Sequence, residues 1–201
     1  MMYYIGKFFS QLYLNACEKR VLKKLAVPRT RKEVRIRAPF VVTHEELITI
    51  GLGTEFLKGV NIYIYPDRLQ KGLPTPPHLV IGNHCYFGVR TKFWIGGDVT
   101  IGNNVVSAND VTFISENHGF DPESEIPYMD QDLSAAPVSV GDNCWIGEKV
   151  SIMPGVNIGK GCVIGAMSVV TQDVPDYSVV AGCPARVIKR YDFEEHVWKK
   201  V

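Results

Sequence analysis

The sequence predicts an all-β chain that winds into a coil of short parallel strands. The first observation is a period of six, in which an aliphatic residue recurs at Val140, Ile146, Ile152, Ile158, Ile164 and Val170. The second is a slender residue four positions after each of these, at Cys144, Val150, Val156, Cys162, Ser168 and Val174. The third is a glycine directly behind four of the aliphatic residues. A repeat of fixed period indicates a solenoid, whose stacked turns bury one continuous core.

The period also predicts the shape of one coil. An inward aliphatic residue at every sixth position places one short strand on each side of a three-sided prism, so three hexapeptides complete a coil. The pairs Gly82-Asn83, Gly102-Asn103 and Gly141-Asp142 suit its corners, where the backbone turns tightly. The slender inward position also accounts for three of the five cysteines as small buried residues, namely Cys85, Cys144 and Cys162.

The same template continues toward the N-terminus with interruptions. It is clear at 95–113 and 81–93 and weaker at 50–62, while 65–77 is rich in proline and basic residues and is expected to be irregular. Between Phe113 and Val140 the repeat stops, which predicts a loop at 116–139 that leaves the prism. Such loops on a rigid scaffold commonly carry function.

The chain divides into three predicted parts: a basic amphipathic segment at 1–40, the prism at 41–190 and a helical tail at 191–201. The net charge of +1 hides +8 in residues 1–37 and −7 in the other 164 residues. Apolar residues fall at helical spacing within the basic segment, at Ile5, Phe8, Phe9, Leu12, Tyr13 and Ala16. Such a stripe with flanking cations suits an anionic membrane surface, or packing on the prism or on a trimer.

The sequence argues against several classes of protein and of site. No stretch is long and apolar enough to span a bilayer or has the order of a signal peptide, so we expect a cytoplasmic protein. The five cysteines show neither close pairs nor metal-ligand spacing, so neither disulfides nor a metal site is expected. The basic segment does not require a nucleic-acid partner.

The repeat at 140–175, followed by 180–189, strongly resembles the hexapeptide-repeat acetyltransferases, and most of all the sugar and polysaccharide O-acetyltransferases. The resemblance covers about 110 residues, from Ile81 to Lys189. It implies a left-handed parallel β-helix, a homotrimer with active sites between neighbouring prisms, and acetyl-CoA as the donor. The helical N-terminal module of the enzymes for free galactosides and maltose has no match here, which favours a polysaccharide or lipid-linked sugar as acceptor.

By this resemblance the catalytic residue is His118, at the start of the loop. A sugar hydroxyl is a poor nucleophile near neutral pH, and an imidazole can take its proton while the oxygen attacks the thioester carbonyl. The resulting oxyanion needs a preorganised donor. The resemblance places that donor directly after Gly147, at the backbone amide of Glu148. Transfer is expected to be direct, without an acyl-enzyme.

The resemblance also assigns the donor site, residue by residue. Trp145 points outward and either lines the acetyl-CoA channel or packs at the trimer interface. Ala166 and Thr171 match contacts to the pantetheine arm. Arg186 and Lys189 match cations for the phosphates, although a solvated basic face is the other interpretation. No metal is implied.

Acceptor recognition is expected from the loop, where 119–136 carries five acidic residues and no basic one. Asn117, Asp121 and Glu123 are the predicted acceptor-binding residues, since carboxylates accept hydrogen bonds from sugar hydroxyls. A streptogramin-type antibiotic acetyltransferase, an amino-sugar N-acetyltransferase and a non-catalytic structural prism remain alternatives. A γ-type carbonic anhydrase is disfavoured because its zinc-binding histidines have no counterparts around His118.

Overall fold

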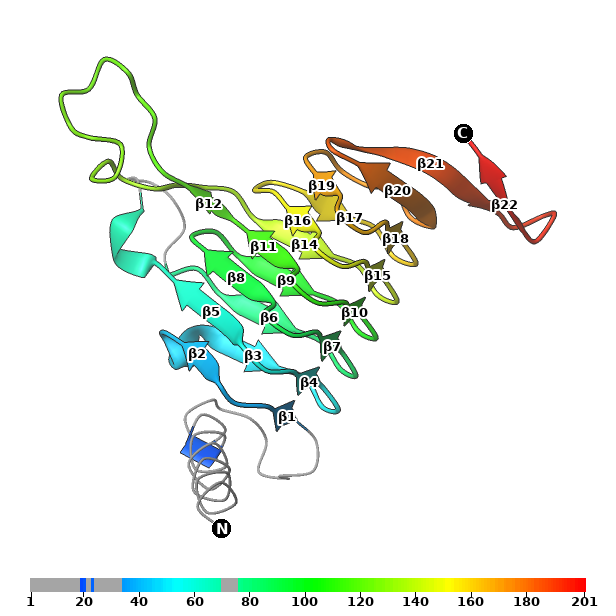
Figure 1. Cartoon of the computed structure of the whole chain (residues 1–201), viewed down its shortest axis with the longest axis horizontal. Helices are drawn as coiled ribbons and strands as arrows, with labels where there is room; N and C mark the ends of the chain where they lie inside the picture. Colours follow the sequence, from blue (N-terminus) through cyan, green and yellow to red (C-terminus); the bar gives the residue numbers. More distant parts are fainter. Residues whose placement is uncertain (1–18, 21–22, 24–33, 70–75) are drawn as a thin grey trace, which may run out of the picture.

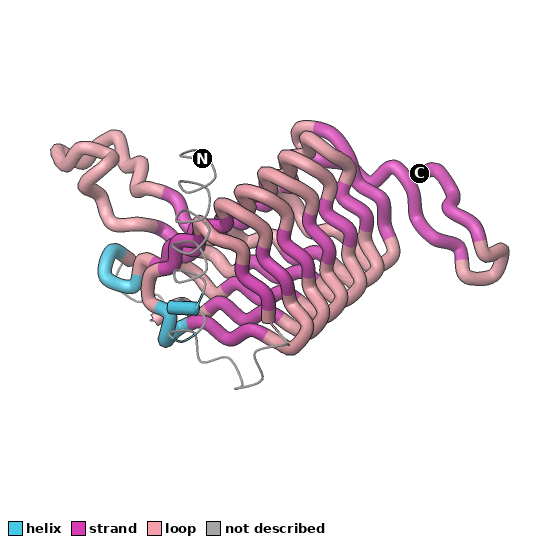
Figure 2. The backbone as a smooth tube through the Cα atoms, turned by 60° about the horizontal axis from the view of Figure 1, so that its bottom comes forward, coloured by secondary structure: helices cyan, strands magenta, loops and turns pink. Residues whose placement is uncertain are grey.

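The structure is a computed structural model that describes residues 19–20, 23, 34–69 and 76–201. Its parallel strands stack in coils around a three-sided prism (Figures 1 and 2). The nine-stranded sheet, here sheet A, contains in order β1 (Arg35–Ile36), β4 (Glu55–Phe56), β7 (Tyr86–Phe87), β10 (Val106–Ser107), β15 (Trp145–Ile146), β18 (Val163–Ile164), β20 (Ser178–Gly182), β21 (Ala185–Asp192) and β22 (Val197–Lys200).

Two further sheets form the other sides of the prism. Sheet B contains β2 (Phe40–Val42), β5 (Val60–Ile64), β8 (Lys92–Ile95), β11 (Thr112–Ile114), β16 (Ser151–Ile152) and β19 (Val169–Val170). Sheet C contains β3 (Ile48–Ile50), β6 (Leu79–Ile81), β9 (Val99–Ile101), β14 (Val138–Val140) and β17 (Asn157–Ile158). Successive prism strands visit the three sheets in turn and pair in parallel with the coil below. The predicted left-handed parallel β-helix is therefore confirmed.

The residues of the six-residue period form the core. Ile146, Ile152, Ile158 and Ile164 are at most 1% exposed. The lower coils are filled instead by phenyl rings, and those of Phe93 and Phe113 stack with their centroids 4.7 Å apart. The three inward cysteines are buried as predicted, and burial raises the pKa of the Cys85 thiol.

Side chains at the corners hold one coil to the next. Asn103 Oδ1 accepts a hydrogen bond from the Asn83 amide at 2.9 Å, and Asp142 Oδ1 accepts one from the Asn103 amide at 2.7 Å. A Cβ on Gly102 would overlap Asp142 Oδ1, so glycine is needed directly before the corner residue. These contacts explain why Gly-Asn and Gly-Asp pairs recur, since each satisfies a backbone donor that the turn leaves unpaired.

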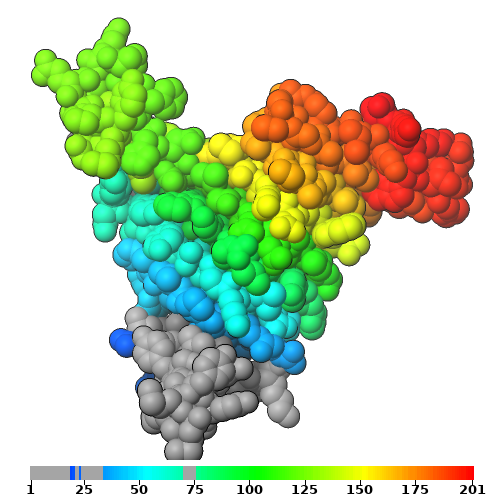
Figure 3. Space-filling model, viewed as in Figure 1, coloured from blue at the N-terminus to red at the C-terminus, as the bar shows by residue number. Residues whose placement is uncertain are grey.

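The predicted loop leaves the prism between sheets B and C. Its two stems, β12 (Glu116–Asn117) and β13 (Ser134–Ala135), pair in an antiparallel ribbon. The predicted irregular segment begins beside this ribbon with the short 3-10 helix η2 (Pro66–Arg68), and a second 3-10 helix, η1 (Glu45–Leu47), precedes β3. The loop and the C-terminal strands project from opposite sides of the body (Figure 3).

The prediction of a helical tail at 191–201 is wrong. The chain from Ala185 onward forms an antiparallel hairpin of β21 and β22. Tyr191 and Trp198 pair across it with ring centroids 5.3 Å apart. Asp192 closes the turn by accepting the amides of Glu194 and Glu195. Cross-strand aromatic contacts and this turn favour strands over a helix that would have no surface to pack on.

The prism begins before residue 41, because β1 pairs with β4 and β2 pairs with β5. The helix predicted from the apolar stripe at 5–16 lies outside the described residues. Within the described part of the chain, no helix is both long and apolar enough to cross a membrane.

Candidate active site

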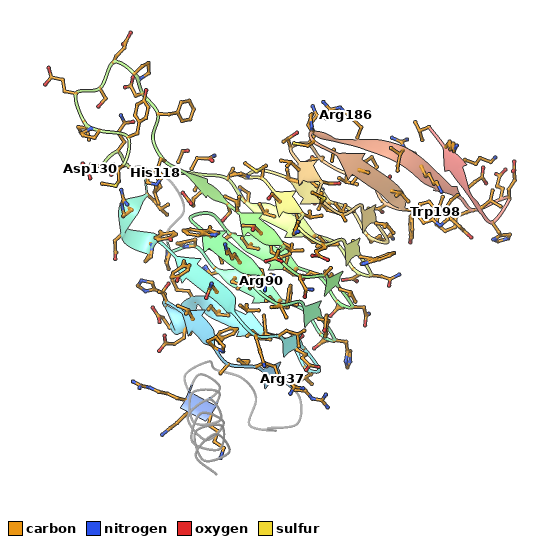
Figure 4. All side chains as sticks on the ribbon, viewed as in Figure 1. Arg37, Arg90, His118, Asp130, Arg186 and Trp198 are labelled. Carbon is orange, nitrogen blue, oxygen red and sulfur yellow. The ribbon has the colours of Figure 1, made fainter. Side chains whose placement is uncertain are left out.

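His118 follows the outgoing stem of the loop. It comes directly after β12 and is exposed at the loop base, as Figure 4 shows. Asn117 lies in β12 opposite Ser134 and is also exposed. The short antiparallel ribbon thus fixes the backbone on which the predicted general base stands.

A half-buried carboxylate lies close to His118. Glu116 is two residues earlier, at the spacing that places side chains on one side of a strand. Burial raises the pKa of the Glu116 carboxyl, while the charges of protonated His118 and of Arg68 favour its ionised form and oppose this rise. Gly96 provides the space, since a Cβ there would lie 2.6 Å from the Glu116 Cβ. The sequence analysis missed Glu116, although its spacing from His118 was a usable signal.

The loop is held in shape by one buried side chain. Gln131 is 8% exposed, and its Oε1 accepts the Asp121 amide at 3.0 Å. Its Nε2 donates to the carbonyls of Asp121 and Ile126 at 3.1 and 2.9 Å. Arg68 of η2 donates to the Met129 carbonyl at 2.6 Å and ties the loop to the prism. These hydrogen bonds give the loop a defined conformation and attach it to the prism.

A pocket opens within this loop, directly after His118 in the chain. It combines apolar and aromatic side chains with three carboxylates, and its lining residues are Gly119, Phe120, Asp121, Pro122, Ser124, Ile126, Tyr128, Asp130, Gln131, Asp132 and Ser134. Of the three predicted acceptor residues, Asp121 lines it. Asn117 lies on the stem, and Glu123 lies on the loop, where its amide donates to Asp121 Oδ1 at 2.9 Å.

Most of the predicted donor residues lie along a different edge of the prism. Trp145 points outward from sheet A and is 59% exposed, and Gly147 and Glu148 turn the chain from sheet A to sheet B. Ala166 stands directly over this corner, since a Cβ on Gly147 would lie 2.6 Å from the Ala166 amide nitrogen. One coil higher, Ala181 pairs with Arg186.

The corner at Glu148 lacks the side-chain acceptor that some other corner amides have. Two coils below, the Val89 amide donates to Asn109 Oδ1 at 2.9 Å. The residue over Glu148 is Ala166, which has no side-chain acceptor. In the described part of the chain, no hydrogen bond uses the Glu148 N–H, although its carbonyl accepts from Met167 at 2.7 Å. A backbone donor is thus left available where the resemblance expects the oxyanion.

A β-bulge aligns the predicted phosphate-binding pair. In a regular strand Arg186 and Lys189, three residues apart, would face opposite sides. Val179 pairs with Lys189 and Val180 with Val187, so β21 holds one extra residue at this point. Ala181 then pairs with Arg186, which brings both cations to the outward face of sheet A, the face that carries Trp145.

The predicted site residues are therefore divided between two edges of one chain. Glu148 and Ala166 lie at the edge between sheets A and B. His118 lies at the edge between sheets B and C, and Thr171, which follows β19, turns toward sheet C at that same edge. His118 and Arg186 are well separated in Figure 4. One chain therefore holds His118 and the Glu148 corner at different edges of its prism.

Comparison with known proteins identifies the family. Residues 137–172 match the bacterial transferase hexapeptide family, described by six repeats. The Escherichia coli K12 protein WbbJ, named for O-acetyl transfer in lipopolysaccharide biosynthesis, is 41% identical over 171 residues, which cover 82% of this chain and 83% of WbbJ. The chain belongs to the hexapeptide-repeat transferases. Like the named relatives, this transferase is an acetyltransferase.

Two further proteins, one similar in sequence and one similar in structure, extend the comparison. The galactoside O-acetyltransferase of Escherichia coli K12 is 42% identical over 121 residues, which cover 60% of this chain and 58% of that enzyme. A solved structure of AntD, an N-acyltransferase from Bacillus cereus, in complex with dTDP-4-amino-4,6-dideoxyglucose and coenzyme A, superposes with a TM-score of 0.69 over 88% of this chain and 91% of that one. At 21% identity, this likeness shows the shared fold.

The Glu148 amide, which has no hydrogen-bond partner in the described chain, can be tested by giving it one. Ala166→Asn should place a side-chain acceptor over that amide, as Asn109 does over Val89. We expect kcat for acetyl transfer to fall about 100-fold or more, because one oxyanion donor is then occupied. The measurement is steady-state kinetics with the melting temperature as a check on folding. Ala166→Leu has a similar size without the acceptor, and an equal loss in that variant would contradict the assignment.

Proposed function

We propose that this protein transfers the acetyl group of acetyl-CoA to a hydroxyl of a carbohydrate, a cell-surface polysaccharide or its lipid-linked precursor. The observation that carries the proposal is an exposed histidine directly before Gly119, the first residue that lines a loop pocket of carboxylates and aromatic rings. Carboxylates accept hydrogen bonds from sugar hydroxyls, and aromatic rings pack against the apolar faces of sugars. The similarity to WbbJ supports a polysaccharide acceptor.

The proposed reaction is a direct transfer. Asp121, Asn117 and Glu123 position the sugar, and His118 removes the proton of the attacking hydroxyl. The new C–O bond gives a tetrahedral oxyanion that accepts a hydrogen bond from the Glu148 amide. Its collapse breaks the C–S bond, and the coenzyme A thiolate leaves and is protonated by the imidazolium. The nearby Glu116 carboxylate stabilises that imidazolium while it carries the proton.

We further propose that the enzyme is a homotrimer with its sites between neighbouring prisms. The division of the site residues supports this, because a second copy can present its Glu148 edge to His118 of the first. A row of outward side chains on sheet A also supports it. Tyr86, Val106 and Trp145 are aligned by the strand register and are 37, 43 and 59% exposed. Contiguous exposed apolar side chains of this kind mark an interface.

The acceptor class is tested by measuring release of free coenzyme A thiol with a panel of acceptors. We expect activity on glycans with free hydroxyls, an O-acetylated product by mass spectrometry, and loss of about 100-fold or more in His118→Ala, since general-base catalysis contributes about that much. Preferential acetylation of amino sugars or streptogramins would support the alternatives instead. Full activity in His118→Ala would overturn the assigned base.

The shared site predicts complementation between two inactive variants. When His118→Ala and Ala166→Asn chains are mixed and reassembled, some sites combine an intact His118 from one chain with an intact Glu148 corner from another. For random mixing the two probabilities are one half each, so about one quarter of full activity is expected. Each variant reassembled alone is the control. No recovery in mixed trimers, with mixing verified by mass, would contradict a site between copies.

We place the enzyme in the cytoplasm, with residues 1–37 as a contact to the inner face of the membrane. The support is the charge of +8 on that segment and its apolar stripe. The full chain should co-sediment with vesicles that contain anionic lipid, less so at high salt, and removal of residues 1–33 should abolish this. Neutral vesicles are the control. Equal sedimentation with and without the segment would count against the contact.

A further inference from the structure

Three aromatic side chains gather on the outward face of sheet B. Tyr63 of β5 is in register with Trp94 of β8, and Tyr65 follows directly after β5, on the same face as Tyr63. The ring centroid of Trp94 lies 5.4 Å from that of Tyr63 and 6.3 Å from that of Tyr65, and the two tyrosine centroids are 6.5 Å apart. The three rings thus form one contiguous group, here called the aromatic cluster.

The polar groups of the aromatic cluster are not used within the described part of the chain. No hydrogen bond among the described residues involves the hydroxyl of Tyr63 or Tyr65 or the indole N–H of Trp94. Because no fully buried side-chain nitrogen or oxygen there lacks a partner, these three groups reach the surface, although the rings are half-buried. Burial raises the pKa of the Tyr65 phenol, and the Glu116 carboxylate raises it further. The hydroxyl is therefore a hydrogen-bond donor at neutral pH.

The aromatic cluster is joined to the strand that carries His118. The Ser115 amide donates to the Trp94 carbonyl at 2.9 Å, and Ser115 directly precedes β12. Three residues of extended chain, about 10 Å, then lead from Ser115 to His118. Figure 1 shows β5 and β8 ending on the side of the prism from which the loop leaves. The cluster precedes His118 along the chain and the loop pocket follows it, so His118 stands between the two.

The aromatic residues of β5 and β8 are confined to the part of their outward face near the loop. At the preceding outward position of the two strands, Asn61 is in register with Lys92, and both are polar. The cluster also lies near the carboxylate of Glu116, which raises the pKa of Tyr65. Rings with free polar groups beside a carboxylate suit a ligand that has an apolar face and a rim of hydroxyls. A sugar ring has this combination.

We propose that Tyr63, Tyr65 and Trp94 bind a second sugar ring of the acceptor, next to the ring that presents its hydroxyl to His118. The inference rests on the proposed function and deepens it, because it makes the acceptor a glycan of linked sugars rather than a free monosaccharide. The aromatic rings pack against the apolar face of the second sugar. The tyrosine hydroxyls and the indole N–H exchange hydrogen bonds with its hydroxyls.

The test compares kcat/KM for acetyl transfer to a monosaccharide and to a trisaccharide of the same sugar. The probes are the methyl glycosides and linear trisaccharides of glucose, galactose and rhamnose. The unaltered enzyme should prefer the trisaccharide. Trp94→Ala should lower kcat/KM for the trisaccharide about tenfold, mainly through KM, since one aromatic contact is lost, and should leave the value for the monosaccharide unchanged. Trp94→Phe should retain most of the preference. Lys92→Ala, on the same face of β8, is the matched control and should change neither value.

Three results would overturn the inference in distinguishable ways. Equal kcat/KM for the two substrates in the unaltered enzyme would remove the second sugar and leave the carbohydrate acceptor in place. An equal loss for both substrates in Trp94→Ala, or a change of its oligomeric state in size-exclusion chromatography, would show that the cluster packs within the protein or against another copy. Absence of transfer to every carbohydrate probe would overturn the proposed function itself. Melting temperatures of all variants show whether each one is folded.

Discussion

The whole molecule depends on one packing constraint: every sixth residue must fill the interior of a narrow prism directly above the residue one coil below. Because the inward side chains stack in vertical register, the strands of each sheet are parallel and aligned, and the corners fall in columns along the three edges. Ile146 and Ile164 illustrate this, since they pair directly and are both almost fully buried. A shift of one residue would turn the core residues of a strand outward.

The proposed catalytic groups lie at two edges of the prism, at a corner that lacks a side-chain acceptor and at the point where the loop leaves. At some corners a backbone amide donates to a side-chain acceptor in the coil above, as Asn83 donates to Asn103. At Glu148 the residue above is an alanine, and no hydrogen bond within the described chain uses the amide. At the edge between sheets B and C the coil opens into the ribbon that carries His118. Both departures are local, and the rigid prism fixes where each one lies.

Acidic and basic residues are also separated in the structure. Acidic residues gather in the loop pocket, where the proposed ligand is a neutral sugar that donates hydrogen bonds. Basic residues gather on the outward face of the C-terminal hairpin, where the resemblance predicts binding of phosphate. The two sites of opposite sign project from opposite sides of one prism (Figure 3). In the proposed homotrimer, the donor and the acceptor meet where the loop of one copy faces the edge between sheets A and B of another.

The sequence by itself determined the period, the inward residues and the point where the loop leaves, because burial imposes a local pattern that can be counted along the chain. It also indicated His118 and the corner at Glu148, through resemblance. Only the tertiary structure decided which groups lie together. The bulge that aligns Arg186 with Lys189, the pairing of Lys189 with Lys200, and the hydrogen bond from Arg68 to the Met129 carbonyl all join residues whose proximity has no periodic signature. The helical prediction for the tail failed for the same reason, since the pairing of Tyr191 with Trp198 across a turn outweighs local propensity. The division of the site between two edges is likewise a property of the folded prism, because it depends on which side of the coil each residue occupies.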